Sequence, residues 1–300
     1  MKKFQKRLYI FIFGFILFIG IDLILQKEFL YKKDYFKLPK NVSNVVFGHS
    51  HVECGYNTKF IKNTINLGSS GEAYIYTYFK AKKVVEKNPQ IKNVFIEFTN
   101  NQIDSVMDNW TWDDMHLQYE LKNYFFLMDN KDLIFLYEKN SSGFQSAFSK
   151  MLFTNLGKLI IKRNIKDGDC GGYIAKDKNI NEEENSSDVT IQNAHKNNVS
   201  KKKVLSECNI FYLKKLVSFC HEKKIKVFLI RTPMSKNYST FRTEGVYKKI
   251  VLKEFKNIQY LDFKDYPLFD SDFLDKEHLN TKGAEKYSKF FNDTLSKLKL

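Results

Sequence analysis

The sequence predicts an α/β fold with a doubly wound, mostly parallel sheet of about five strands, preceded by an N-terminal transmembrane helix. Apolar runs of strand length alternate with helical patterns along much of the 300-residue chain. This alternation is typical of a parallel sheet that is covered by helices on both faces. A single apolar segment near the N-terminus is long enough to cross a bilayer. Between the third and fourth predicted strands we expect a helical and loop insertion.

Residues 8–25, with the sequence LYIFIFGFILFIGIDLIL, form the apolar segment, and Asp22 is their only charged residue. As a helix they span about 27 Å, close to the thickness of the bilayer core. Because no small-residue cleavage pattern follows, we expect an uncleaved anchor rather than a signal peptide. Asp22 lies one turn from the end, where its carboxylate is expected to reach the lipid headgroups. The chain then divides into a cytoplasmic tail at 1–7, a linker at 26–41 and a domain at 42–300.

The basic residues do not fix the orientation of this anchor by count. Four Lys and Arg residues precede the apolar segment, and five follow it within fifteen residues. A basic tail ahead of an apolar helix nevertheless favours a cytoplasmic N-terminus. The expected location is therefore the inner or cytoplasmic membrane, crossed once, with the large domain outside the cytoplasm.

Each predicted strand is a short apolar run. The five runs lie at 44–48, 64–68, 92–98, 225–233 and 258–263. Amphipathic helices are predicted at 72–88, 207–224 and 280–298. Asn88 and Pro89 end the first of these helices, and Asn280 or Thr281 is the expected N-cap of the last.

The insertion at about 105–206 contains two contrasting parts. Residues 119–139 are rich in aromatic side chains and are expected to be helical. Residues 166–203 are polar and show little apolar periodicity, so we expect an exposed loop or a disordered insertion there. A flap over a binding site is the alternative interpretation of this polar part.

The formal charge of +15 has two interpretations. It reflects either an abundance of lysine along the whole chain, or attraction to an anionic partner such as a membrane surface or an acidic polysaccharide. Because the sequence contains no arginine-rich cluster or nucleic-acid-binding motif, we expect no nucleic-acid partner. The four cysteines show no CxxC or zinc-knuckle spacing and do not identify a compartment.

Polar clusters follow four of the five predicted strands. These clusters are GHSH (48–51), NLGSSGEAY (66–74), EFTNNQID (97–104) and DKEHLNTKGA (275–284). The carboxyl ends of parallel strands share one edge of the sheet, and ligands bind outside that edge. We therefore expect the four clusters to contribute to one site.

One serine and one histidine in these clusters have the properties of a nucleophile and its base. The hydroxyl of Ser50 does not ionise near neutral pH and needs a neighbouring base before it can attack a carbonyl. Asp275 and His278 are three residues apart, so on a turn or a helix start their side chains face the same way. A hydrogen bond from the imidazole Nδ1 to the carboxylate would leave Nε2 free as the base. We therefore expect Ser50, His278 and Asp275 to form a catalytic triad.

An oxyanion hole needs hydrogen-bond donors directed at the charge that develops during acyl transfer. The candidates are the backbone N–H groups of Ser50 and Gly71 and the side-chain amide of Asn101. Asn100, the neighbour of Asn101, is the alternative amide.

The four clusters, in this order, resemble the sequence blocks of the SGNH/GDSL hydrolases. That family has a serine after the first strand, a glycine after the second, an asparagine after the third, and an Asp-x-x-His pair near the C-terminus. The matching residues here are Ser50, Gly71, Asn101, Asp275 and His278. Asn101 is the better match for the asparagine, and the resemblance covers about residues 42–104 and 225–298.

The anchor and the motifs GHSH and NLGSSGEAY bring the chain closer to a membrane-anchored branch of this family. That branch includes the D-alanine transfer protein of teichoic acid modification and the alginate O-acetylation proteins. The resemblance implies a three-layer, flavodoxin-like domain that acts, without a cofactor, as a serine esterase or O-acyltransferase. Its substrates would be an acyl donor and a cell-surface glycan, and a membrane-bound O-acyltransferase would be a partner.

Two departures from the family pattern define an alternative function. His49 stands where the wider family has an aspartate, and the asparagine block lacks the usual G-x-N-D pattern. A catalytically inert domain of the same fold, serving as an anchored glycan-binding or assembly subunit, would account for both.

The histidines beside Ser50 also admit a metal-site interpretation. His49, His51 and Cys54 offer ligands within six positions, and His278 would complete the set. The residues after Gly48 are not expected to continue as a strand, and no other ligand cluster in the sequence supports the site, so we predict no metal. For His51 we expect either indirect support of the site residues or a structural hydrogen bond, rather than binding of a metal. The remaining histidines, expected to be surface or hydrogen-bonded side chains, are His116, His195 and His221.

Overall fold

The computed structural model describes residues 2–30, 36–161, 171–177, 205–236 and 244–300. Contacts between residues divide the chain into two compact units. The sheet unit comprises 40–78, 90–110 and 171–300, and the helical unit comprises 1–39, 79–89 and 111–170. The predicted insertion is thus divided, because residues 111–170 group with the N-terminal segment.

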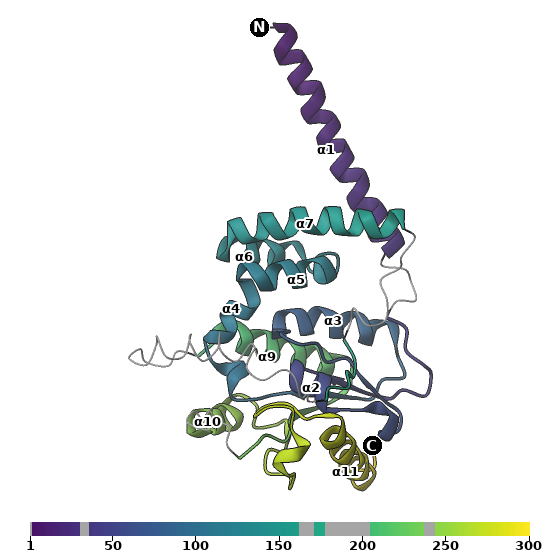
Figure 1. The fold of residues 1–300 in the computed structure, drawn as a ribbon, viewed down its shortest axis with the longest axis vertical. Helices are drawn as coiled ribbons and strands as arrows, with labels where there is room; N and C mark the ends of the chain where they lie inside the picture. Colours follow the sequence, from purple (N-terminus) through teal and green to yellow (C-terminus); the bar gives the residue numbers. More distant parts are fainter. Residues whose placement is uncertain (1, 31–35, 162–170, 178–204, 237–243) are drawn as a thin grey trace. The chain divides into compact units, whose positions relative to one another are not determined.

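Five parallel strands form the centre of the sheet unit (Figure 1). They are β1 (Asn44–Phe47), β2 (Thr64–Asn66), β3 (Asn93–Glu97), β4 (Lys226–Arg231) and β5 (Gln259–Asp262). Their order is β2-β1-β3-β4-β5, and all neighbouring pairs are parallel. The predicted α/β class is confirmed, and each strand lies within its predicted range.

The strand order reverses direction at β1. From β1 the chain moves outward to β2 and then returns to the other side of β1 to form β3. In open α/β sheets, ligands bind at such a reversal, outside the carboxyl ends of the strands. The segments that follow Phe47, Asn66 and Glu97 leave the sheet at this edge, and two of the predicted site residues, Gly71 and Asn101, lie on the second and third segments.

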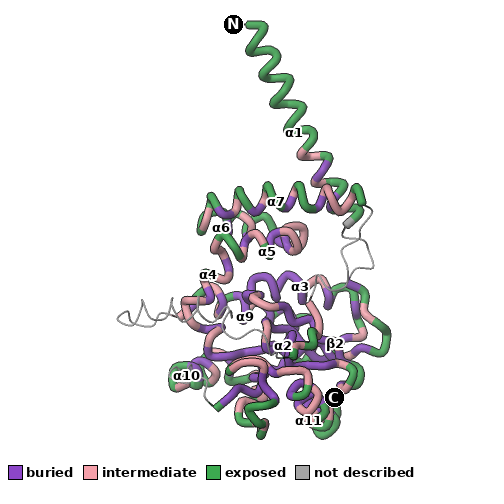
Figure 2. The backbone as a smooth tube through the Cα atoms, viewed as in Figure 1, coloured by how far each residue is buried: buried purple, intermediate pink, exposed green. Residues whose placement is uncertain are grey.

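Helices cover both faces of this sheet, which explains the continuous apolar character of its strands. α11 (Thr281–Lys297) packs on one face, where Phe291 joins a core with Phe95 and Phe228. The rings of Phe95 and Phe228 stack with their centroids 4.8 Å apart. α9 (Glu207–Glu222) lies on the opposite side of the sheet from α11 (Figure 1). β1 and β3 are buried along their whole length (Figure 2), whereas β5 at the edge of the sheet is partly exposed.

Helix caps agree with the sequence. Asn280 is the N-cap of α11, and its side chain accepts a hydrogen bond of 3.0 Å from Gly283 N.

α10 (Glu244–Glu254) was not expected from the sequence. The shorter elements of the sheet unit are α2 (Ser50–Gly55), η1 (Thr58–Phe60), η2 (Asn101–Ile103) and η5 (Asp270–Asp272). Residues of both units occur in α3 (Tyr74–Lys87) and α4 (Val106–Trp112).

Part of the polar stretch 166–203 is hydrogen-bonded to the rest of the sheet unit. Residues 171–177 bind the sheet unit through backbone hydrogen bonds from Gly172 N to Gly68 O (2.8 Å) and from Ile174 N to Glu53 O (3.0 Å). Gly171 has a positive φ of 95°, and a Cβ atom there would overlap the carbonyl of Gly68. The two glycines of the sequence DCGG permit this close approach. Residues 166–170 and 178–203 lie outside the described residues.

The longer helices of the helical unit are α1 (Lys2–Leu30), α5 (Asp114–Tyr124), α6 (Asn130–Lys139) and α7 (Ser141–Ile160). Within the described ranges, α1 is the one helix long and apolar enough to cross a membrane, with a mean hydropathy of 2.7. It continues through residues 26–30, which the sequence analysis assigned to the linker, because no glycine or proline interrupts it there. The helical prediction for 119–139 is correct apart from a turn at 125–129.

A buried polar cluster joins α1 to α7. Gln26 Nε2 donates hydrogen bonds to Asp22 Oδ2 (2.6 Å) and to the carbonyl of Leu152 (3.2 Å). Asn155 Nδ2 donates to Gln26 Oε1 at 3.1 Å. Asp22 is therefore buried, and the expectation that it reaches the headgroups is wrong. The amide of Gln26, one turn further along α1, provides its partner instead.

Arg231, the last residue of β4, is fully buried and pairs with two carboxylates. Its guanidinium donates to both oxygens of Asp262 and to both oxygens of Glu244, the latter at 2.9 and 3.0 Å. Burial alone would raise the pKa of Glu244, but hydrogen bonds from Arg231 and Asn100 outweigh this effect and lower the pKa to about 2. These contacts fix α10 and β5 to the end of β4.

We expect Arg231→Met to lower the free energy of unfolding by about 3 kcal/mol near neutral pH, because it leaves two carboxylates without their buried partner. Urea titration measures this change. Lys248→Met is the control, because Lys248 is an exposed cation 3.7 Å from Glu244, and its removal should cost less than about 1 kcal/mol.

The stability difference between wild type and Arg231→Met should depend on pH. The folded pKa of Glu244 is lowered, so its contribution to stability is present above its ordinary value of 4.5 and is lost as the pH falls towards 2. The stability difference between wild type and Arg231→Met should therefore shrink over this range. A difference that stays constant during acidification would contradict the pairing.

Candidate active site

Ser50 begins α2 directly after β1. The strand ends at Phe47, and Gly48 and His49 turn the chain into the helix. A Cβ atom at position 48 would overlap the carboxylate of Glu97 and the side chain of Val52, so this turn requires glycine. At the first helical position the backbone N–H of Ser50 has no acceptor within the helix. Ser50 therefore lies on a strand-to-helix turn at the carboxyl edge of the sheet.

The structure brings Ser50, His278 and Asp275 together. His278 Nε2 lies 2.7 Å from Ser50 Oγ, although the two residues are 228 positions apart. On the other side of the ring, His278 Nδ1 lies 2.8 Å from Asp275 Oδ2. The backbone N–H of His278 also donates to Asp275 Oδ1 at 2.8 Å. The carboxylate therefore orients the imidazole, with Nδ1–H as its donor and Nε2 left to accept from the serine hydroxyl.

Asp275 is ionised at neutral pH. Burial raises the pKa of this carboxyl, but hydrogen bonds from the side chain and backbone of His278 and from the backbone of Glu277 outweigh that effect and lower the pKa to about 2. The side chains of Asp275 and His278 are 30% and 21% exposed. The pair is therefore accessible to a ligand while its orientation is fixed by the protein.

Gly71 lies in the loop after β2. It has a φ of 77°, in the left-handed region that favours glycine. Two contacts fix this loop beside α2: Ser69 N donates to Gly48 O at 3.0 Å, and the backbone N–H of Ser70 donates to Glu53 Oε1 at 3.1 Å. The hydroxyl of Ser70 binds the other oxygen of Glu53. The loop is thereby held against the helix that carries Ser50.

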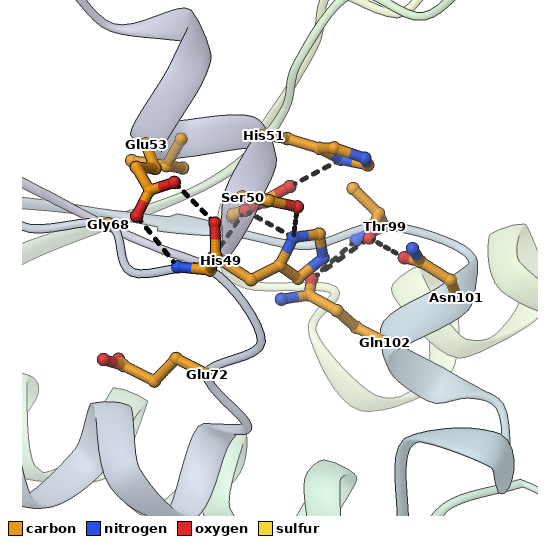
Figure 3. A network of polar contacts seen from close by, with 12 residues as sticks. His49, Ser50, His51, Glu53, Gly68, Glu72, Thr99, Asn101 and Gln102 are labelled. Carbon is orange, nitrogen blue, oxygen red and sulfur yellow. Dashed lines mark hydrogen bonds and ion pairs between the residues drawn. The ribbon is translucent and has the colours of Figure 1, made fainter. Parts of the chain in front are cut away.

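Asn100 and Asn101 differ sharply in their surroundings. Asn100 is 3% exposed; its oxygen accepts from Arg231 at 2.8 Å and its amide group donates to Glu244 at 3.0 Å. Asn101 is half-buried at the start of η2, and its oxygen accepts from the hydroxyl of Thr99 (Figure 3). That bond leaves the amide NH₂ group of Asn101 as a candidate donor to a ligand.

The carboxylate of Glu97, the last residue of β3, lies beneath the serine. One of its oxygens accepts from His49 N at 2.9 Å, and the other lies 2.9 Å from His51 Nδ1. His51 Nε2 in turn lies 3.5 Å from Glu277 Oε2. Glu277 immediately precedes His278, so these contacts connect the helix of Ser50 to the loop of its base.

His49 and His51 differ in charge: His49 is neutral and His51 is protonated. Burial lowers the pKa of His49 to about 4, so this ring is neutral. Burial also opposes protonation of His51, but the charge of Glu97 and contacts with Glu277 raise its pKa to about 10. Glu97 shows the complementary shift, because the charge and hydrogen bond of His51 and the backbone hydrogen bond from His49 lower its pKa despite its burial. Glu97 and His51 therefore form a fully buried ion pair.

His49 also approaches the nucleophile. Its Nδ1 lies 3.3 Å from Ser50 Oγ, a longer contact than the 2.7 Å between Ser50 Oγ and His278 Nε2. Figure 3 shows Ser50 together with His49 and His51 beside the Thr99–Gln102 segment. The serine oxygen thus contacts two imidazoles. In His49 the nitrogen that faces the serine, Nδ1, is also the one near a carboxylate, at 3.7 Å from Glu97 Oε2. In His278 the carboxylate binds Nδ1, which leaves Nε2 to accept the proton of the serine.

Lys176 adds a cation to the neighbourhood of Glu53. It belongs to the segment 171–177, and its Nζ lies 3.4 Å from Glu53 Oε2. The carbonyl of Lys176 accepts from Thr281 N at 3.0 Å, at the beginning of α11. The segment therefore contacts α2, the loop after β2 and the start of α11, which follows the loop of Asp275 and His278.

A metal site would use a different set of residues from the one considered in the sequence. His49, His51 and Glu97 offer ligand atoms within 4.8 Å of one another, as do His51, Glu277 and His278. Cys54 belongs to neither group among the described residues, and burial raises the pKa of its thiol to about 11. Both groups include His51, which is protonated and paired with Glu97, so His51 would have to lose a proton before it could bind a cation.

Sequence reasoning missed Glu97, Glu277 and Lys176 as parts of the site. Glu97 had a recognisable signal, because a carboxylate at the end of the apolar run NVFIEF must find a partner when the strand is buried. Glu277 lies inside the motif DKEH but has no fixed role there. Lys176 had no signal, since its segment shows no apolar periodicity.

Two of the remaining histidines are described, and they are the hydrogen-bonded or surface side chains that the sequence predicts. His116 Nδ1 lies 2.7 Å from Asp113 Oδ1 at the start of α5, and His221 is exposed near the end of α9. His195 lies outside the described residues.

Comparisons with known proteins give distant similarities. One protein-family model matches residues 178–299, less than half of the chain. No curated protein matches the sequence. A protein from Streptococcus pneumonia proposed to be a platelet activating factor has a TM-score of 0.43 at 10% identity, covering 94% of this chain and 98% of that one.

Two further solved structures are similar at the same level. A proposed acylhydrolase from Bacteroides fragilis has a TM-score of 0.40 at 14% identity, covering 89% of this chain and 95% of that one. A GDSL-like lipase from Bacteroides thetaiotaomicron has a TM-score of 0.39 at 10% identity, covering 89% and 96%. Similarities at these TM-scores do not indicate a function, so any functional proposal rests on the geometry of the site.

The charge states of the two buried histidines are measurable by NMR of protein labelled with ¹⁵N at histidine. We expect His51 to stay protonated on both ring nitrogens through neutral pH, and His49 to stay neutral until the pH approaches 4. Variants His51→Gln and His49→Gln assign the signals. Titration of His51 near the ordinary value of 6.5 would contradict the buried ion pair.

Proposed function

We propose that the chain is a membrane-anchored serine esterase or O-acyltransferase of the SGNH type. The observation that carries the proposal is the hydrogen-bonded chain from Ser50 Oγ through His278 to Asp275, with distances of 2.7 and 2.8 Å. These residue types and contacts are those of a nucleophile, its base and the carboxylate that orients the base. The position at the carboxyl edge of a doubly wound sheet, where such folds bind ligands, supports it.

In this mechanism, the Ser50 hydroxyl attacks the carbonyl carbon of an ester or thioester, and its proton passes to His278 Nε2. Asp275 stabilises the imidazolium that forms. The N–H groups of Ser50 and Gly71 and the amide of Asn101 stabilise the oxyanion. His278 then returns the proton to the departing alcohol or thiol, which leaves the acyl group esterified to Ser50.

The second half of the reaction repeats these steps with a new nucleophile. Water or a sugar hydroxyl attacks the acyl-enzyme while His278 accepts its proton. Collapse of the second tetrahedral intermediate returns this proton to Ser50 and releases the acid or the acylated sugar. Hydrolysis and transfer therefore use the same residues, and access of the acceptor to the acyl-enzyme decides between them.

The proposed substrates and location rest on the resemblance to the anchored branch of the family and on α1. We propose an acyl donor and a cell-envelope or extracellular glycan as substrates, with a membrane-bound O-acyltransferase as a partner. α1 would cross the cytoplasmic membrane once with its N-terminus inside, and the sheet unit would work outside the cytoplasm. The apolar length of α1 supports this arrangement.

The alternative of an inert glycan-binding subunit makes a different prediction for Ser50. A domain that only binds has no need for a serine within 2.7 Å of an imidazole that a carboxylate orients. The geometry therefore favours the enzyme.

A fluorophosphonate probe tests the nucleophile in the full chain. We expect labelling of wild type at Ser50, no labelling of Ser50→Ala, and labelling of His278→Gln that is slower by about 10²-fold or more, because the general base is lost. Ser271→Ala and His221→Gln change exposed residues of the same types and should label like wild type. Equal labelling of Ser50→Ala would refute the assignment, and an unlabelled wild type would favour the inert alternative.

The two asparagines should separate activity from stability. Asn101→Ala is expected to lower kcat for a simple acetyl ester by about 10²-fold, as loss of an oxyanion donor does, with little change in the unfolding midpoint. Asn100→Ala should instead lower the midpoint, because it removes the buried amide that hydrogen-bonds both Arg231 and Glu244. The reverse pattern would move the oxyanion role from Asn101 to Asn100.

A further inference from the structure

The C-terminal half of α7 exposes apolar side chains that no described residue covers. Phe153, Ile160 and Ile161 are 73%, 74% and 71% exposed, and we call these three residues the α7 patch. Leu156 and Leu159 flank them and are half-buried. Large apolar side chains that gather on one face of a soluble helix mark a contact surface.

The same helix face is polar in its N-terminal half. Residues seven apart on a helix lie on nearly the same side, with a drift of about 20°. Ser146, Phe153 and Ile160 therefore follow one another along one face, and Ser146 is exposed like the other two. The face changes from serine to apolar residues within two turns, so its apolar character belongs to one end of the helix.

That apolar end is the end attached to α1. Gln26 of α1 binds the carbonyl of Leu152 and the side chain of Asn155, which are both within three residues of Phe153. α1 itself exposes large apolar side chains close to this junction, including Ile24 and Phe29. Because Gln26 binds α7 next to Phe153, the α7 patch lies close to the part of α1 that would contact lipid.

Basic residues accompany the junction. Lys27 follows Gln26 on α1, and Lys158 lies three residues after Asn155 on α7. In the sequence, Lys162 and Arg163 come next after the helix, outside the described residues. Lys and Arg beside an apolar helix face are typical of helices that lie in the membrane interface, because their long side chains reach the headgroups.

We propose that the C-terminal half of α7 inserts its apolar patch into the interface of the bilayer that α1 crosses. This inference rests on the anchoring role proposed for α1 and is independent of the chemistry at Ser50. The cluster of Asp22, Gln26 and Asn155 fixes α7 to the last turns of α1, and this attachment places the patch at the level of the headgroups. The serine half of α7 would remain in water.

Lipid quenching of tryptophan fluorescence tests this placement in the full chain, reconstituted in nanodiscs. The variants are Phe153→Trp in the patch and Ser146→Trp on the same face two turns earlier, and wild type supplies the background from Trp110 and Trp112. Lipids brominated near the top of the acyl chains should quench most of the emission that Phe153→Trp adds, and little of the emission that Ser146→Trp adds. Ile160→Trp provides a second position in the patch.

Each outcome decides the proposal. Equal quenching at positions 146 and 153, or none at 153 and 160, would overturn it; in the latter case, crosslinking between chains would show whether a second copy covers the patch. A chain that does not enter the nanodiscs would overturn the anchor and the patch contact together. Fluorophosphonate labelling of Ser50 in the same samples keeps these failures distinct from a failure of the proposed chemistry.

Discussion

The candidate site depends on the buried carboxylate of Glu97. A charge at the end of a central strand costs several kcal/mol unless it is paired and hydrogen-bonded. Glu97 meets this requirement through the backbone of His49 and the imidazole of His51. Both partners belong to the turn that begins α2, so the requirement for pairing also fixes the position of Ser50. Gly48 is part of the same constraint, because any side chain there would collide with Glu97.

The second contact of His51 extends this constraint to the base. Its Nε2 lies 3.5 Å from Glu277, one residue before His278, and the rings of His51 and His278 lie 5.1 Å apart. The nucleophile and the base come from opposite ends of the chain, and a protonated imidazole between two carboxylates joins them. His49 stands where the SGNH/GDSL hydrolases that the sequence resembles have an aspartate. It is neutral here, and the nearby buried carboxylate comes from β3.

The sequence predicted the parts of the molecule that local patterns determine. The strands, the helices that cover them and the Asp-x-x-His spacing follow from periodicity and from the chemistry of the residue types, and the parallel sheet brings the clusters to one edge. The ion pair of Glu97 and His51 could be suspected only from the carboxylate in an apolar strand. Asp22 was misjudged because its partner, Gln26, is itself oriented by α7, a contact that spans 126 residues.

Other contacts had no local signal at all. The segment 171–177 reads as a polar loop, yet the glycines at 171 and 172 allow its backbone to bind Gly68 and Glu53. The buried Arg231 attaches α10 through Glu244, which explains a helix that the sequence did not indicate. Such contacts depend on the three-dimensional arrangement of distant residues, which periodicity does not encode.

The central claim is that Ser50 becomes acylated during turnover with His278 as its base. Mass spectrometry of the full chain, quenched in acid soon after mixing with p-nitrophenyl acetate, measures this directly. The account predicts an acetyl group on the peptide that contains Ser50 in wild type, and its absence in both Ser50→Ala and His278→Gln at the same mixing time. Turnover of the ester without acetyl-Ser50, or acetylation confined to another residue, would contradict the account.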